Sequence, residues 1–151
     1  MMRQAFGVMA LAAVLVGCGD DDTVGDDERS SASLEGTEGW EQLSGSATVR
    51  WVEGTPGFLA NIELEGDEPD QVRPWHVHFG TCESGGAIVG PPDDYPPLQI
   101  GGGGRAETNA TVDAELDRDE DYHVNVHLSE DELDTIIACG DLEEDEPVVQ
   151  F

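Results

Sequence analysis

Short runs of alternating apolar and polar residues recur along the chain, and they limit its fold more than any other feature. Side chains of a β-strand point alternately to opposite faces, so such a run buries one face and exposes the other. We expect strands at 46–53, 57–65, 71–79, 105–116, 121–128 and 135–142, and one helical turn at 129–133. Strands of this length separated by turn residues predict an all-β fold, an antiparallel barrel or sandwich.

The N-terminus has the pattern of an export signal. Residues 1–4 carry one cation, Arg3, and residues 5–16 form an apolar stretch too short to cross a bilayer as a helix. The stretch ends in Leu15-Val16-Gly17-Cys18, which resembles the lipobox of bacterial lipoproteins. The resemblance implies that residues 1–17 are removed and that Cys18 carries lipid, which would hold the protein at the membrane of the cell envelope. An ordinary secretory signal with an incidental cysteine is the alternative.

Residues 18–39 are rich in Asp, Ser and Gly and almost free of large apolar side chains. Such a composition buries too little surface to offset the cost of ordering the backbone, so it predicts a flexible acidic tether. The folded domain is then expected to span residues 40–151.

The chain is strongly acidic. It has 34 Asp and Glu residues against six Arg and no Lys, and its formal net charge is −28. Nucleic acid and anionic membrane surfaces are therefore poor partners. The absence of lysine is typical of a protein from a saline habitat, where salt screens the repulsion; an acidic secreted protein of ordinary salinity is the alternative.

Three cysteines are an odd number for an exported chain. If Cys18 carries lipid, Cys82 and Cys139 remain, and outside the cytoplasm such a pair most simply forms a disulfide. Cys82 also begins a long connection, 81–104, rich in Gly and Pro. A connection of this length that is fixed by a disulfide is expected to form an ordered wall over a site.

All four histidines lie in two of the expected strands: His76 and His78 in RPWHVHFG, His123 and His127 in YHVNVH. Residues two apart on a strand share a face, so His76 and His78 can converge on one ion. His123 and His127 lie ~13 Å apart along an extended strand, so at most one of them joins that pair. The pattern predicts a metal site for copper or zinc; histidines that are only solvated or structural are the alternative.

The order WHVHFG, a cysteine, VNVH and then ACGD resembles the copper/zinc superoxide dismutase family, most closely its divergent bacterial lipoprotein-type members. The resemblance covers roughly residues 70–142 and implies a flattened Greek-key β-barrel. It makes His76, His78 and His127 copper ligands, and Cys82 and Cys139 the disulfide. His123 has no counterpart in that family.

Three departures from the family concern activity. The 81–104 connection contains no histidine, so the bridging ligand and the zinc site of the family are missing. Ile136 stands where the family has an arginine that guides superoxide, and the charged guiding loop is absent. A chain of this net charge also repels a small anionic substrate at low salt. Asp93 or Asp94 could supply a missing ligand.

The expected function is therefore a copper-binding, superoxide dismutase-like domain at the cell envelope, and zinc is not expected at the family's zinc site. Two alternatives remain open on the same residues. One is a copper carrier without turnover. The other is a structural or binding module, because HxH followed by YxVNVH also resembles the chordin-type (CHRD) domain.

Overall fold

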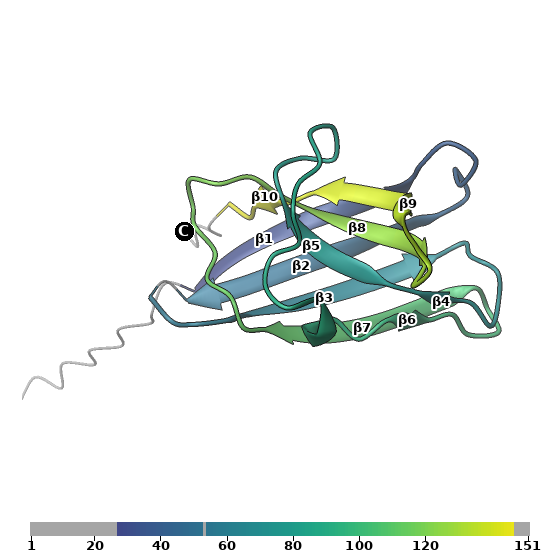
Figure 1. Ribbon diagram of the computed structural model, residues 1–151, viewed down its shortest axis with the longest axis horizontal. Helices are drawn as coiled ribbons and strands as arrows, with labels where there is room; N and C mark the ends of the chain where they lie inside the picture. Colours follow the sequence, from purple (N-terminus) through teal and green to yellow (C-terminus); the bar gives the residue numbers. More distant parts are fainter. Residues whose placement is uncertain (1–26, 53, 147–151) are drawn as a thin grey trace, which may run out of the picture.

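The computed structural model describes residues 27–52 and 54–146, and this part of the chain is built almost wholly of β-strands (Figure 1). The strands are β1 (Asp27–Gly36), β2 (Ser44–Val52), β3 (Phe58–Glu65), β4 (Val72–Arg73), β5 (Trp75–Phe79), β6 (Leu98–Gln99), β7 (Arg105–Val112), β8 (Tyr122–Ser129), β9 (Glu132–Asp141) and β10 (Glu143–Glu144). A single 3-10 turn, η1 (Pro92–Asp94), is the only helical element among the described residues.

The strands form one curled antiparallel sheet in the order β5-β8-β9-β1-β2-β3-β7, with β10 paired to β1. The short β4–β6 pair lies between the two ends of this sheet, since β4 runs into β5 and β6 packs against β7. Chain order and spatial order therefore differ: β3 lies beside β7, and β8 lies beside β5. β1, β2 and β3 are neighbours both in sequence and in space, and β9 returns over a long connection to lie beside β1. This is the Greek-key pattern that the family resemblance implies.

The core lies inside the curl and is built by the inward-facing residues of the alternating strands. In β3, Phe58, Ala60, Ile62 and Leu64 are buried and the residues between them are more exposed. The remaining large buried side chains come mainly from the other strands of the curl and include Leu34, Val49, Trp75, Val77, Val112, Val124 and Ile137. The all-β prediction is thus confirmed, and its basis in period-two alternation holds for the central strands.

The boundary predicted at residue 40 is wrong, because β1 lies inside the segment expected to be a tether. Its residues pair with β2 over nine positions, from Asp27–Val52 to Glu35–Ser44. Ser30, Ala32 and Leu34 face inward and are buried. Small side chains suffice there because the backbone ladder and the neighbouring strands supply the packing, which composition alone does not show.

Two smaller expectations also need correction. Pro74 interrupts the expected strand 71–79 and leaves β4 and β5, since proline has no N–H for a ladder. The expected helical turn at 129–133 is a tight hairpin in which Ser129 pairs with Glu132. The predicted signal peptide (1–17) and the lipidated Cys18 lie outside the described residues. In the described part of the chain, no helix is long and apolar enough to cross a membrane.

Candidate metal centre

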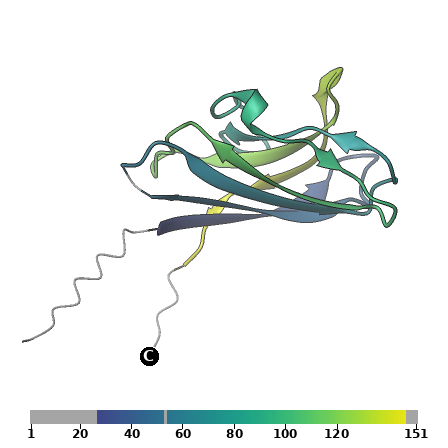
Figure 2. The same cartoon turned by 90° about the horizontal axis from the view of Figure 1, so that it is seen from below.

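Strands β5 and β8 place all four histidines on one face of the sheet. The two strands pair in the register His76–Asn125 and His78–His123, so these side chains and His127 point away from the core. The alternate residues, such as Trp75 and Val124, point into it. Figure 2 shows η1 and its connection on the far side of the curl from β1 and β2. The same connection covers the histidine face, because the ring of Tyr95 packs against the ring of His76.

Three of the four histidines form a compact cluster. One ring nitrogen from each of His76, His78 and His127 lies within 4.8 Å of the other two. His76 Nδ1 is 3.1 Å from His127 Nε2. The three residues are only 5%, 7% and 4% exposed, which is rare for histidine unless its polar atoms have partners. The structure thus brings together the three residues that the sequence analysis names as ligands.

Backbone carbonyls orient two of the rings. His78 Nδ1–H donates to the Gly86 carbonyl at 3.0 Å, and His127 Nδ1–H donates to the Leu133 carbonyl at 2.6 Å. Each bond places the ring proton on Nδ1 and leaves Nε2 with a free lone pair. Carbonyls that fix the tautomer in this way are the usual outer partners of metal-binding histidines.

The cluster fits a metal ion on two grounds. His78 Nε2 is buried and has no hydrogen-bond partner, and a buried lone pair that stays unpaired is costly unless something binds it. Two nitrogens that bind one ion at ~2.0–2.1 Å lie roughly 3.1–4.1 Å apart. His76 Nδ1 and His127 Nε2 are 3.1 Å apart, and one ring nitrogen from each of the three residues lies within 4.8 Å of the others, so small ring movements complete the geometry.

His76 is the ring that must adjust. His127 Nε2 can only accept, since its proton is on Nδ1, so His76 Nδ1–H donates to it at 3.1 Å. A metal ion at this point requires the proton of His76 to move to Nε2, which is a change of tautomer and leaves the ring neutral.

Burial keeps all three rings neutral. It lowers the pKa of His76 to about 4, and the neighbouring His127 and His78 lower it further. Burial also lowers the pKa of His78 to about 4, against the opposing effect of its bond to Gly86. The pKa of His127 is lowered by the same cause, although its bond to Leu133 and the charge of Asp134 act to raise it. Neutral imidazole is the form that binds metals, so the cluster is ready to bind at neutral pH.

His123 lies beside the cluster and is not part of it. Its ring stacks on that of His78, with centroids 5.2 Å apart, and its Nδ1–H donates to the Gly80 carbonyl at 2.9 Å. His78 and His123 therefore hold the two ends of the segment from Gly80 to Gly86. This agrees with the expectation that His123 and His127 do not both join His76 and His78.

The predicted disulfide is present and fixes the same segment. Cys82 and Cys139 are bonded, with their Cα atoms 6.0 Å apart. Cys139 lies in β9 opposite Asn125 in β8, so the bond ties the start of the connection to the sheet beside the cluster. The connection thus forms the ordered wall that the sequence analysis expects.

Asn125 is a polar residue of this face to which the sequence analysis gives no role. It is 3% exposed, lies between His123 and His127 along β8, and its Oδ1 has no hydrogen-bond partner. The period-two alternation of YHVNVH places it on the histidine face, but nothing in the sequence shows that its carbonyl is unpaired.

No carboxylate joins the three histidines among the described residues, where the only group able to hold a metal consists of imidazoles. Asp94 Oδ2 instead accepts the N–H of Asp113 at 3.0 Å. Ile136 is 37% exposed on β9. Comparison with known proteins identifies no family: no family model matches the chain, and no curated protein matches it.

Proposed function

We propose that this protein binds a single copper ion through His76, His78 and His127, as a superoxide dismutase-like domain of the cell envelope. The observation that carries the proposal is the buried cluster of three neutral imidazoles in which His78 Nε2 has no partner. The order of the HVH, VNVH and ACGD segments supports the family resemblance.

Copper is preferred over zinc by the donor set. All three donors are nitrogens, and among divalent first-row ions copper binds such donors most tightly. No carboxylate or thiolate of the described part of the chain joins the cluster. The Cys82 and Cys139 sulfurs are bonded to each other.

Copper, when bound, supplies one-electron chemistry, and the residues of the chain supply its surroundings. Gly86 and Leu133 hold the rings of His78 and His127 through their carbonyls. Tyr95 and the connection around it exclude bulk water from His76. Three protein donors leave a position for a small ligand, which favours superoxide dismutation as a second function.

Features of the chain argue that such turnover is slow. Ile136 offers no charge where the family has its guiding arginine, and the net charge of −28 repels an anion at low salt. A copper carrier or buffer uses the same ligands without turnover. The lipobox-like Cys18 supports attachment of this domain to a membrane through lipid.

The proposal is tested by titrating the metal-free protein with Cu(II) in competition with a chelator. We expect one ion per chain and at least a hundredfold weaker binding in His78→Ala and His127→Ala. His123→Gln is the matched control, because it alters a buried histidine of the same face that lies outside the cluster. Equal affinity in all four proteins, each shown to be folded by circular dichroism, would refute the copper site.

Dismutation is tested separately with the copper-loaded protein. Superoxide decay is followed at low and at molar salt, with free copper and His78→Ala as controls. Copper binding without decay faster than the controls selects the carrier function.

A further inference from the structure

We infer that the buried ion pair of Asp67 and Arg73 positions His127 for metal binding. The inference rests on the proposed copper site and adds residues that lie outside the ligand set. Arg73 acts through the backbone of Leu128, which directly follows the ligand His127.

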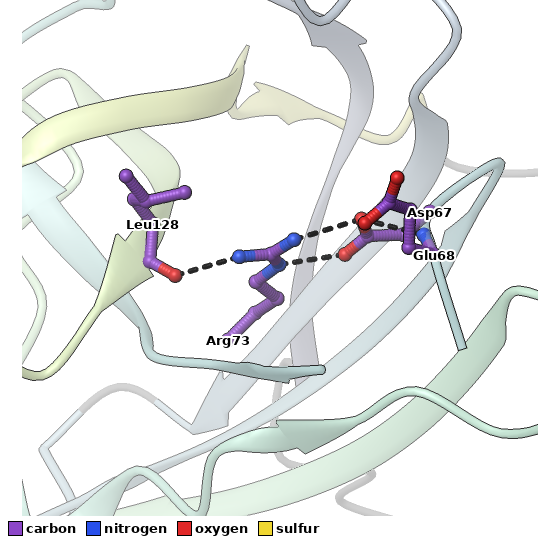
Figure 3. Close-up of polar contacts among 4 residues, drawn as sticks. All are labelled: Asp67, Glu68, Arg73 and Leu128. Carbon is purple, nitrogen blue, oxygen red and sulfur yellow. Dashed lines mark hydrogen bonds and ion pairs between the residues drawn. The ribbon is translucent and has the colours of Figure 1, made fainter. Parts of the chain in front are cut away.

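The contacts form a continuous chain from the β3–β4 connection to β8 (Figure 3). Arg73 Nε and Nη2 donate to the two carboxylate oxygens of Asp67 at 2.7 and 2.9 Å. Arg73 Nη1 donates to the Leu128 carbonyl at 2.8 Å. Asp67 Oδ1 is fixed in turn by the N–H of Glu68 at 2.8 Å. The guanidinium also lies 5.3 Å from the ring of Trp40, close enough for a cation–π contact.

Both charged side chains are removed from solvent. That of Arg73 is 5% exposed and that of Asp67 is 0% exposed. A guanidinium with five donors in a rigid plane can hold a carboxylate and a carbonyl at once, and burial fixes its orientation. Arg73 is thus a rigid support for the Leu128 carbonyl.

The support is needed because β8 loses its regular partner at this point. The pairing of β8 with β9 shifts register between Val126 and His127, and again between His127 and Ser129. Leu128 lies inside this irregular stretch and has no partner in the ladder. Irregular pairing of this kind re-aims side chains and is common beside functional sites.

Arg73 and Pro74 together hold both sides of His127. The N–H of His127 donates to the Pro74 carbonyl at 2.8 Å, and the carbonyl of the following residue, Leu128, accepts from Arg73. Two contacts from adjacent residues of one segment fix the backbone that carries the ring. His127 is also the only ligand that β8 contributes, so a shift here opens the cluster.

If the ion pair only stabilised the fold, replacing it would leave the metal affinity unchanged. Replacing a buried ion pair by apolar residues of similar size is often neutral or stabilising, whereas removing one partner is costly. The double substitution Asp67→Leu with Arg73→Met should therefore preserve the fold while removing the bond to the Leu128 carbonyl, together with the smaller contacts to Glu68 N–H and Trp40. This variant therefore distinguishes an effect on metal affinity from an effect on the fold.

The experiment compares Cu(II) affinity and the Cu(II) electron paramagnetic resonance spectrum of this double variant with those of the wild type. We expect about 10- to 100-fold weaker binding, as for other outer-shell substitutions, and changed g and hyperfine values. The matched control is Glu65→Leu with Arg105→Met, which removes an exposed arginine–carboxylate pair between β3 and β7. It should leave both readouts unchanged. A folded Asp67→Leu/Arg73→Met variant with wild-type affinity and spectrum overturns the inference.

Two further measurements complete the test. Arg73→Lys keeps a charge for Asp67 but cannot reproduce the planar fork, so it should also weaken copper binding; unchanged affinity counts against the inference if the double variant fails to fold. In the metal-free protein, the Nδ1–H signal of His127 should shift or broaden in ¹⁵N NMR when Arg73 is replaced. That signal needs no copper, so a wild type that fails to bind copper refutes the proposed function, whereas an unchanged signal refutes the role of Arg73.

Discussion

Loss of the Cys82–Cys139 disulfide should destabilise the metal-free protein by a predictable amount. The bond joins residues separated by 57 positions. Closing a loop of this length in the unfolded chain costs about 4 kcal/mol of conformational entropy at 25 °C, which the disulfide removes from the folding reaction. For a domain of this size that free energy corresponds to a fall in Tm of roughly 16 °C.

The assay is urea unfolding of Cys82→Ser/Cys139→Ser and of the wild type, both free of metal and at one fixed salt concentration. Urea is preferred to guanidinium chloride because an ionic denaturant would also screen a net charge of −28. Ser84→Ala is the control. It removes the hydroxyl that accepts the Thr81 N–H at 2.9 Å in the same connection, and should cost no more than about 1.5 kcal/mol.

The structure also predicts which amides lose protection from hydrogen exchange first when the disulfide is removed. The two amides that pair β5 with the connection are Val89 N–H, which donates to Val77 O, and Phe79 N–H of β5, which donates to Ala87 O; both should lose protection from hydrogen exchange. The amides that pair β2 with β3 should keep their protection and exchange only through global unfolding. A disulfide contribution below about 1 kcal/mol would refute the loop-entropy reasoning.

Three other outcomes are expected. In the metal-free protein His76 and His78 should titrate near pKa 4 by NMR, because burial disfavours the charged rings. Both pKa values lie below the value near 6.5 of the unfolded chain, so the stability that the neutral rings contribute is complete above pH 6.5 and declines as the pH falls toward 4. The difference in the free energy of unfolding between wild type and His76→Asn, taken from urea curves at a series of pH values, measures this contribution. Trp75→Phe removes the N–H that donates to the Pro96 carbonyl at 2.8 Å and should lower the free energy of unfolding by about 1–3 kcal/mol, measured by circular dichroism in urea. Raising NaCl from 0.1 to 1 M should raise the urea midpoint, because the Debye length falls from ~10 to ~3 Å; a lower midpoint in high salt would contradict the repulsion argument.

The strands that the sequence predicts well are those with large apolar residues in strict alternation, such as β3, where every second residue is buried. Besides the two-residue strands β6 and β10, the strand that it misses is β1, whose inward side chains include Ser30 and Ala32. A small side chain adds little to a hydrophobic pattern, so the pairing of β1 with β2 is visible only in three dimensions.

The period-two alternation of a strand also makes the candidate site predictable in part. The two-residue spacing places His76 and His78 on one face, but spacing alone cannot bring His127 to them, because that depends on the β5–β8 register. Support for the rings comes from the carbonyls of Gly86 and Leu133. Every residue has a carbonyl, so these partners leave no signal in the sequence.

The position of β1 also sets how far the domain could lie from a membrane if Cys18 were anchored there by lipid. The strand begins at Asp27, so few residues remain between it and Cys18. Even fully extended, that length of chain reaches only roughly 30 Å. If Cys18 carries a lipid, as the lipobox-like pattern implies, the domain would stay close to the bilayer surface, and a copper ion bound as proposed would stay in the layer of ions next to the headgroups.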